Sequence, residues 1–162
     1  FYAQCSNCRS FVLFHGYNET YSKDTTIKIE QMFPELQSVD QVVPERPRNY
    51  LKQAIESQHA PDGAILLCAS ALDAMLKDQG YRKGNLFSRI DKAQEEGLIT
   101  SQMQGWAHET RLAANEQRHA DEEVEITTEE DAVECINLTK AFAEYLYVLP
   151  SKIRRWKQGE EE

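Results

Sequence analysis

Three polar residues stand at intervals of four along the chain, Arg111, Asn115 and His119. Steps of four drift only slowly around a helix axis, so these side chains are expected to line one helical face. An arginine can bind two phosphate oxygens, a histidine can give or take a proton near neutral pH, and an asparagine can orient either partner. Metal-independent RNA cleavage needs a base, an acid and a cation, and these residues are of the right types to supply them.

The spacing limits what one copy of this motif can do. On an unbroken helix, eight residues separate the backbones of Arg111 and His119 by about 12 Å, which is long for joint action on one phosphate. Two antiparallel copies could bring Arg111 of one chain near His119 of the other. A catalytic interpretation of Arg111, Asn115 and His119 therefore requires a symmetric homodimer.

A structural interpretation of the same residues stays open beside the catalytic one. Asp73 lies in the apolar segment 64–76 and needs a cationic partner there, for which Arg111 is a candidate. Asn115 can satisfy a carbonyl on a neighbouring helix. His119 lies where its helix should end, and a cation is favourable near a helix C-terminus.

Hydrophobic residues recur with helical spacing from Pro47 onward and predict an all-α, antiparallel bundle of about five helices. Glycines at 80 and 97 are expected to end helices. One helix is expected to begin near Thr100 or Ser101, where Ser101 has capping-box spacing with Gln104, and another at Thr127. Pro150 should kink or interrupt the last helix, leaving a basic turn at 151–157. The predicted helices span about 47–58, 61–79, 86–96, 101–119 and 127–149.

Several side chains are predicted to pack inward in this bundle. Phe87 and Trp106 fall on the apolar stripes of their helices, so Trp106 is interpreted as core rather than as a platform for stacking bases. Cys68 and Cys135 stand alone within helical patterns and are expected to behave as small buried hydrophobes.

The N-terminal part of the chain has a different pattern. Residues 11–14 and 26–30 read as short strands, and Cys5 and Cys8 precede the first of them as a C-x-x-C pair. A structural zinc site needs four ligands, so either a second pair precedes Phe1 or this pair holds no metal. The predicted division is a knuckle, strand and connector segment at 1–45, the helical bundle at 46–158 and an acidic tail at 159–162.

Composition narrows the class of protein. The net charge of -9 argues against a strongly basic nucleic-acid platform, although a local cluster of arginines remains compatible with it. No apolar run approaches the length of a membrane-spanning helix, and no segment has the pattern of a signal peptide. We expect a cytoplasmic protein that does not associate with a membrane.

From Val43 to Trp156 the chain resembles the bacterial and phage family named "domain of unknown function forty-one forty-five", which is grouped with the HEPN-like helical bundles. The Arg-x-x-x-Asn-x-x-x-His motif is the strongest match, followed by an acidic loop and a helix ending in Tyr-Leu-Tyr-x-x-Pro. Leu72-Asp73 and the Glu-Gly-Leu-Ile ending at Ile99 also match. A cysteine knuckle before the bundle, such as Cys5 and Cys8, is common in the family.

The resemblance implies a HEPN-like bundle that commonly dimerises. In active HEPN proteins an arginine and a histidine from each protomer form a metal-independent endoribonuclease site, and such proteins serve as toxins and antiphage effectors. The alternative is a non-catalytic dimerisation or docking module for a protein of a restriction or defence system. Here the Arg111–His119 spacing is longer than is usual in HEPN nucleases, and Ala69 and Ser70 stand where a basic residue is usual.

Overall fold

The computed structural model describes residues 2–4, 11–21, 24–33, 38–116 and 126–159. The chain divides into two compact units, Phe1–Ser38 and Val39–Glu162. The first is a small sheet and the second a helical bundle, so an all-α bundle preceded by a small β segment is confirmed.

The N-terminal unit is an antiparallel sheet of strands β1 (Tyr2–Gln4), β2 (Phe11–Tyr21) and β3 (Asp24–Phe33), in that order. Both predicted strands exist, but β2 runs through Gly16 instead of ending there. The β2–β3 register shifts between His15 and Gly16. A Cβ at Gly16 would lie 2.1 Å from the carbonyl oxygen of Lys28, so only glycine fits this irregular pairing.

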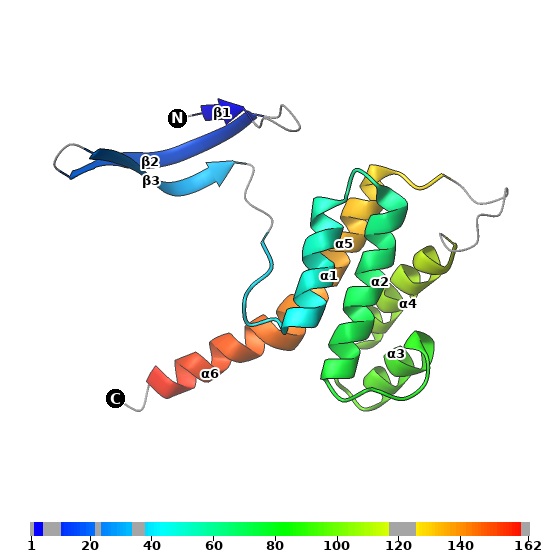
Figure 1. Ribbon diagram of the computed structural model, residues 1–162. Helices are drawn as coiled ribbons and strands as arrows, with labels where there is room; N and C mark the ends of the chain where they lie inside the picture. The colour runs from blue at the N-terminus through cyan, green and yellow to red at the C-terminus, as the bar shows by residue number, and fades with distance from the viewer. Residues whose placement is uncertain (1, 5–10, 22–23, 34–37, 117–125, 160–162) are drawn as a thin grey trace. The chain divides into compact units, whose positions relative to one another are not determined.

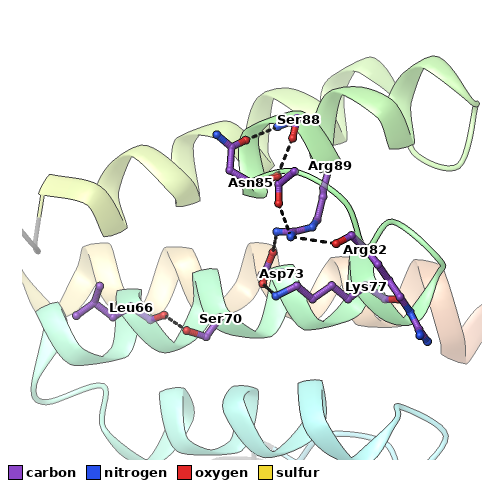
Figure 2. Close-up of polar contacts among 9 residues, drawn as sticks. Leu66, Ser70, Asp73, Lys77, Arg82, Asn85, Ser88 and Arg89 are labelled. Atoms are coloured by element: carbon purple, nitrogen blue, oxygen red, sulfur yellow. Dashed lines mark hydrogen bonds and ion pairs between the residues drawn. The ribbon is translucent and has the colours of Figure 1, made fainter.

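The helical unit is built around one central helix. Figure 1 shows α2 running beside α1, and α2 packs against α1, α3, α4 and α5. The helices are α1 (Glu45–Glu56), α2 (Pro61–Asp78), α3 (Leu86–Glu95), α4 (Ser101–Glu116) and α5 (Glu129–Ala143), followed by the π-helical turn η1 (Glu144–Val148) and α6 (Leu149–Gly159).

The core forms along α2 because its apolar residues are distributed around most of the helix. Leu72, Met75 and Leu76 are buried among the residues of one core cluster. Cys68 lies in a second cluster, where small side chains let the helices approach closely. Cys68 and Cys135 are both buried free thiols, as predicted. A hydrogen bond with Cys135 and burial raise the pKa of Cys68.

The helix ends follow local signals with small displacements. Gly80 and Gly97 take positive φ angles of 103° and 76° directly after helices, as expected of C-terminal stops. The N-cap of α4 is one of the two predicted starts, and that of α5 lies one residue from the predicted position. The Thr100 hydroxyl, rather than that of Ser101, accepts from a backbone N–H of α4, and the capping box of α5 begins at Thr128 rather than Thr127.

Pro150 lies inside α6 and does not interrupt the helix. Proline has no N–H to donate to the preceding turn, and the wider π-helical turn η1 lies directly before it. The Tyr147 hydroxyl anchors this turn, 3.0 Å from Asp78 Oδ2 and 3.3 Å from the Met75 carbonyl oxygen. Burial raises the pKa of Tyr147 to about 12. The predicted basic turn is thus the eleven-residue helix α6, which extends from the bundle.

None of the described helices combines the length and apolar character that crossing a membrane requires.

Candidate functional site

A cavity of about 340 Å³ lies among α2, α3 and α4, and Arg111 and Asn115 both line it. The two residues stand one turn apart on α4, so the predicted placement of these two on one face agrees with the structure. Ser70 and Asp73 of α2 and the first residues of α3 complete the wall. We call this space the cavity.

Two cationic side chains bind Asp73, and neither of them is the predicted partner, Arg111. Arg89 of α3 donates from Nη1 to Asp73 Oδ1 at 2.6 Å, and Lys77 donates to Oδ2 from one turn along α2. The Arg89 side chain is only 10% exposed. The expected arginine from another helix is therefore Arg89, and no ion pair joins Asp73 to Arg111 among the described residues. Sequence could not choose between them, because the choice depends on how α3 crosses α2.

Arg89 also fixes the loop that leads into α3. Its Nη2 donates to the carbonyl oxygens of Arg82, at 3.4 Å, and Gly84. Asn85 then caps α3, its side chain accepting from the Ser88 N–H at 2.9 Å. Arg89 and Asn85 thus hold the N-terminal end of α3 at the cavity wall.

Arg111 rests on an aromatic ring instead of a carboxylate. Its guanidinium carbon lies 5.3 Å from the centroid of the Phe87 ring. Its Nε is buried without a hydrogen-bond partner, and no ion pair within the described residues involves Arg111. Phe87 is 48% exposed, so its predicted inward position is wrong. Phe87 follows Leu86 at the edge of the apolar stripe of α3, where a ring can face α4.

His108 forms a second tie between α3 and α4. Its Nε2 lies 2.9 Å from Asp91 Oδ1, which also accepts from Gln104 at 2.7 Å, and its ring lies 4.9 Å from that of Phe87. Hydrogen bonds from His108, then from Gln104, lower the pKa of Asp91. The other ring nitrogen of His108 is buried without a partner. With one nitrogen on Asp91 and the other covered, His108 joins helices rather than meeting a substrate.

The remaining predicted site residues lie outside the described part of the chain. This applies to His119, Cys5 and Cys8. The described residues include no group of three or more His, Cys, Asp or Glu side chains placed to hold a metal ion. The zinc knuckle and the histidine of the motif therefore stay predictions.

Sequence reasoning missed Arg89, Phe87 and Asp91 as parts of the site. Each belongs to α3, which looked like an ordinary amphipathic helix. Asn85 before an apolar Leu86-Phe87 pair was a readable cap signal for the helix start. Nothing local showed that the polar side of α3 faces α4.

Comparison with known proteins bears on the family alone. No curated protein and no solved structure matches the chain. The family described as "Domain of unknown function (DUF4145)" matches residues 51–159, which includes α2, α3, α4, α5 and all of the cavity-lining residues. The chain belongs to this DUF4145 family.

Proposed function

We propose that the cavity binds a phosphate of RNA and that the protein is a HEPN-like, metal-independent endoribonuclease with a site shared between two copies. Arg111 would bind the phosphate oxygens, Asn115 would orient them and His119 of the partner copy would transfer protons. Toxin or antiphage defence in the cytoplasm of a bacterium is the proposed setting, because cleavage of cellular RNA stops growth.

One observation carries the proposal, the state of the Arg111 guanidinium. The nearby carboxylates are already engaged, Asp73 by Arg89 and Lys77, and Asp91 by His108 and Gln104. Arg111 lines the cavity with no ion pair among the described residues. A guanidinium packed over an aromatic ring is pre-ordered, so the arginine loses little side-chain entropy when it binds an anion.

The chemistry follows from these roles. A neutral histidine takes the proton of the ribose 2′-hydroxyl, and the 2′-oxygen attacks the adjacent phosphorus. The bond to the 5′-oxygen breaks, and a protonated histidine supplies the proton that this oxygen needs. The products are a 2′,3′-cyclic phosphate and a free 5′-hydroxyl. Arg111 would stabilise the charge that develops on the non-bridging oxygens.

The test is cleavage of a labelled single-stranded RNA in EDTA, with the solution mass measured in parallel. We expect a dimer that cleaves, and a loss of about a hundredfold or more in Arg111→Ala and in His119→Ala. Arg111→Lys keeps the charge without the planar fork and should recover part of the rate. Arg48→Ala, which removes an arginine outside the cavity, is the control and should leave the rate unchanged.

Two results would reject the nuclease. The first is a purified wild-type chain that leaves RNA intact, and the second is cleavage that survives both Arg111→Ala and His119→Ala. Mixing those two variants adds a sharper test. A site shared between copies should regain activity through heterodimers that keep one intact Arg111–His119 pair.

A second candidate is a non-catalytic dimerisation or docking module of a restriction or antiphage system, with the motif structural. The contacts of Phe87 favour this candidate. The Phe87 ring of α3 packs against Arg111 and His108 of α4 and so joins the two helices. In that case Arg111→Ala should lower the melting temperature while RNA stays uncleaved by either protein. The partner would then be a protein of the same defence system.

A further inference from the structure

A second concave surface lies on the other side of α4, between α4 and α5. It has a volume of about 550 Å³, and we call it the groove. Its floor is apolar, formed by Trp106 of α4 with Val133, Leu138 and Ala141 of α5. Trp106 is 44% exposed, so its predicted burial in the core is wrong. It lies one residue off the buried stripe of α4 and faces the groove instead.

Helix α6 carries an apolar stripe that nothing in the described part of the chain covers. Leu149, Ile153 and Trp156 are spaced by four and three residues, which puts them on one helical face. All three are exposed, Trp156 by 66%. Among the described elements α6 packs only against η1, the turn from which it continues.

The groove and the stripe are flanked by opposite charges. Glu129, Glu130 and Glu134 line the groove and are exposed. Beside the stripe stand Lys152 and Lys157, both exposed. Lys152 forms an ion pair with Glu144, and Lys157 is in no ion pair with a described residue. Between residues 149 and 159 there is no acidic residue, although the whole chain has a net charge of -9. A basic helix is attracted electrostatically to an acidic surface, and the glutamates that line the groove form such a surface.

The two surfaces also match in length. From Leu149 to Trp156 the stripe rises about 10 Å along α6, and from Val133 to Ala141 the floor rises about 12 Å along α5. The stripe and the groove each present an exposed tryptophan, and docking buries both. Buried tryptophans are typical of the central part of a protein interface.

We propose that α6 of one chain docks into the groove of a second copy, and that the second copy returns its α6 to the first. The exchange is compatible with a two-fold axis, because each copy contributes one stripe and one groove. Trp156 and Ile153 contact Trp106 and Val133 of the other chain. Lys152 and Lys157 pair with the acidic residues that flank the groove. The contact does not depend on RNA cleavage.

The test is a charge exchange read by sedimentation equilibrium of residues 1–162 over a range of concentrations. Variant A carries Lys152→Glu and Lys157→Glu, and variant B carries Glu130→Lys and Glu134→Lys. We expect a wild-type dimer and at least about tenfold weaker dimerisation of A alone and of B alone. An equimolar mixture of A and B should regain dimers, because each acidic α6 then meets a basic groove and each basic α6 an acidic one.

A matched control changes the same amount of charge elsewhere. Lys52→Glu with Lys83→Glu alters exposed residues of α1 and of the loop before α3, and should leave the wild-type mass unchanged. Far-ultraviolet circular dichroism and melting temperature establish that A and B remain folded. Folded A and B should form dimers with each other when they are mixed. A variant that has merely unfolded can therefore be distinguished from one that has lost only the docking contact.

Three results would overturn the proposal. These are a wild-type chain that is monomeric up to millimolar concentration, dimers of A and B as tight as the wild type, and monomers of both that do not recombine on mixing. The second result would assign dimerisation to another surface, including one around the cavity. RNA cleavage by a chain whose groove does not bind α6 would leave the proposed nuclease standing, so the two proposals can fail separately.

Discussion

The cavity and the groove lie on two sides of the same helix, α4, and their charged groups are in opposite states. Around the cavity the two carboxylates are paired, Asp73 with Arg89 and Asp91 with His108, and Arg111 is left without an ion pair among the described residues. Around the groove, Glu129, Glu130 and Glu134 surround an apolar floor and form no ion pair with a described residue. A site whose side chains are already fixed suits a small charged group, whereas unpaired charges around exposed apolar surface suit another protein.

The largest effect should come from breaking the pair that holds the cavity together. Asp73→Ala leaves the Arg89 guanidinium, which is 10% exposed, without its carboxylate. We expect the free energy of unfolding to fall by about 2–3 kcal/mol, somewhat below the range for a fully buried pair because Arg89 keeps its two carbonyl acceptors. Denaturant unfolding at neutral pH measures it.

Lys77→Ala is the matched control for Asp73→Ala. It removes the other cation on the same carboxylate, but the Lys77 side chain is 45% exposed. An exposed pair of this kind contributes about 0–1 kcal/mol. Equal losses for the two variants would mean that Asp73 is held mainly by Lys77 and that Arg89 does not depend on it.

A smaller effect concerns the pH dependence of the tie between α3 and α4. Hydrogen bonds from His108 and Gln104 lower the pKa of Asp91 below its ordinary value of 3.8. A carboxyl whose pKa is lower in the folded state stabilises the fold above its unfolded pKa, and this stabilisation is lost as the pH falls through the folded pKa. Asp91→Asn should therefore flatten the fall in stability as the pH drops from about 5 to below 3.8.

The measurement is denaturant unfolding at a series of pH values. Glu95→Gln makes the same charge change at an exposed position of α3 and serves as the control. A profile for Asp91→Asn that superposes on the wild type would show that the contacts with His108 and Gln104 do not persist in solution.

Local signals predicted the helices better than the contacts between them. Pro61, Gly80 and Gly97 marked helix ends from their own backbone preferences, which act within a few residues. The partner of Asp73 depends on the crossing of two helices, and the pattern gave no information on that crossing. Trp106 and Phe87 each sit one residue from a buried stripe, where a rotation of the helix by a fraction of a turn decides burial. Two of the three motif residues, Arg111 and Asn115, line one face as predicted, because four-residue steps on a helix are local geometry.

The two exposed aromatic residues of this region offer the finest comparison between cavity and groove. Phe87→Ala removes the ring beneath Arg111 and His108, and we expect a loss of about 1 kcal/mol in the free energy of unfolding. Trp106→Ala removes a larger ring that faces the groove, and in the monomer its effect should stay within about 0.5 kcal/mol.

Measuring the stability of both variants at low micromolar concentration and again at the highest soluble concentration separates folding from association. The Trp106→Ala loss should grow with concentration, because only the wild type gains stability from dimerisation through the groove. The Phe87→Ala loss should stay constant when the groove holds the copies together. A reversal of the two behaviours would reject that contact and would assign the interface to the cavity side of α4, where the proposed nuclease site is shared.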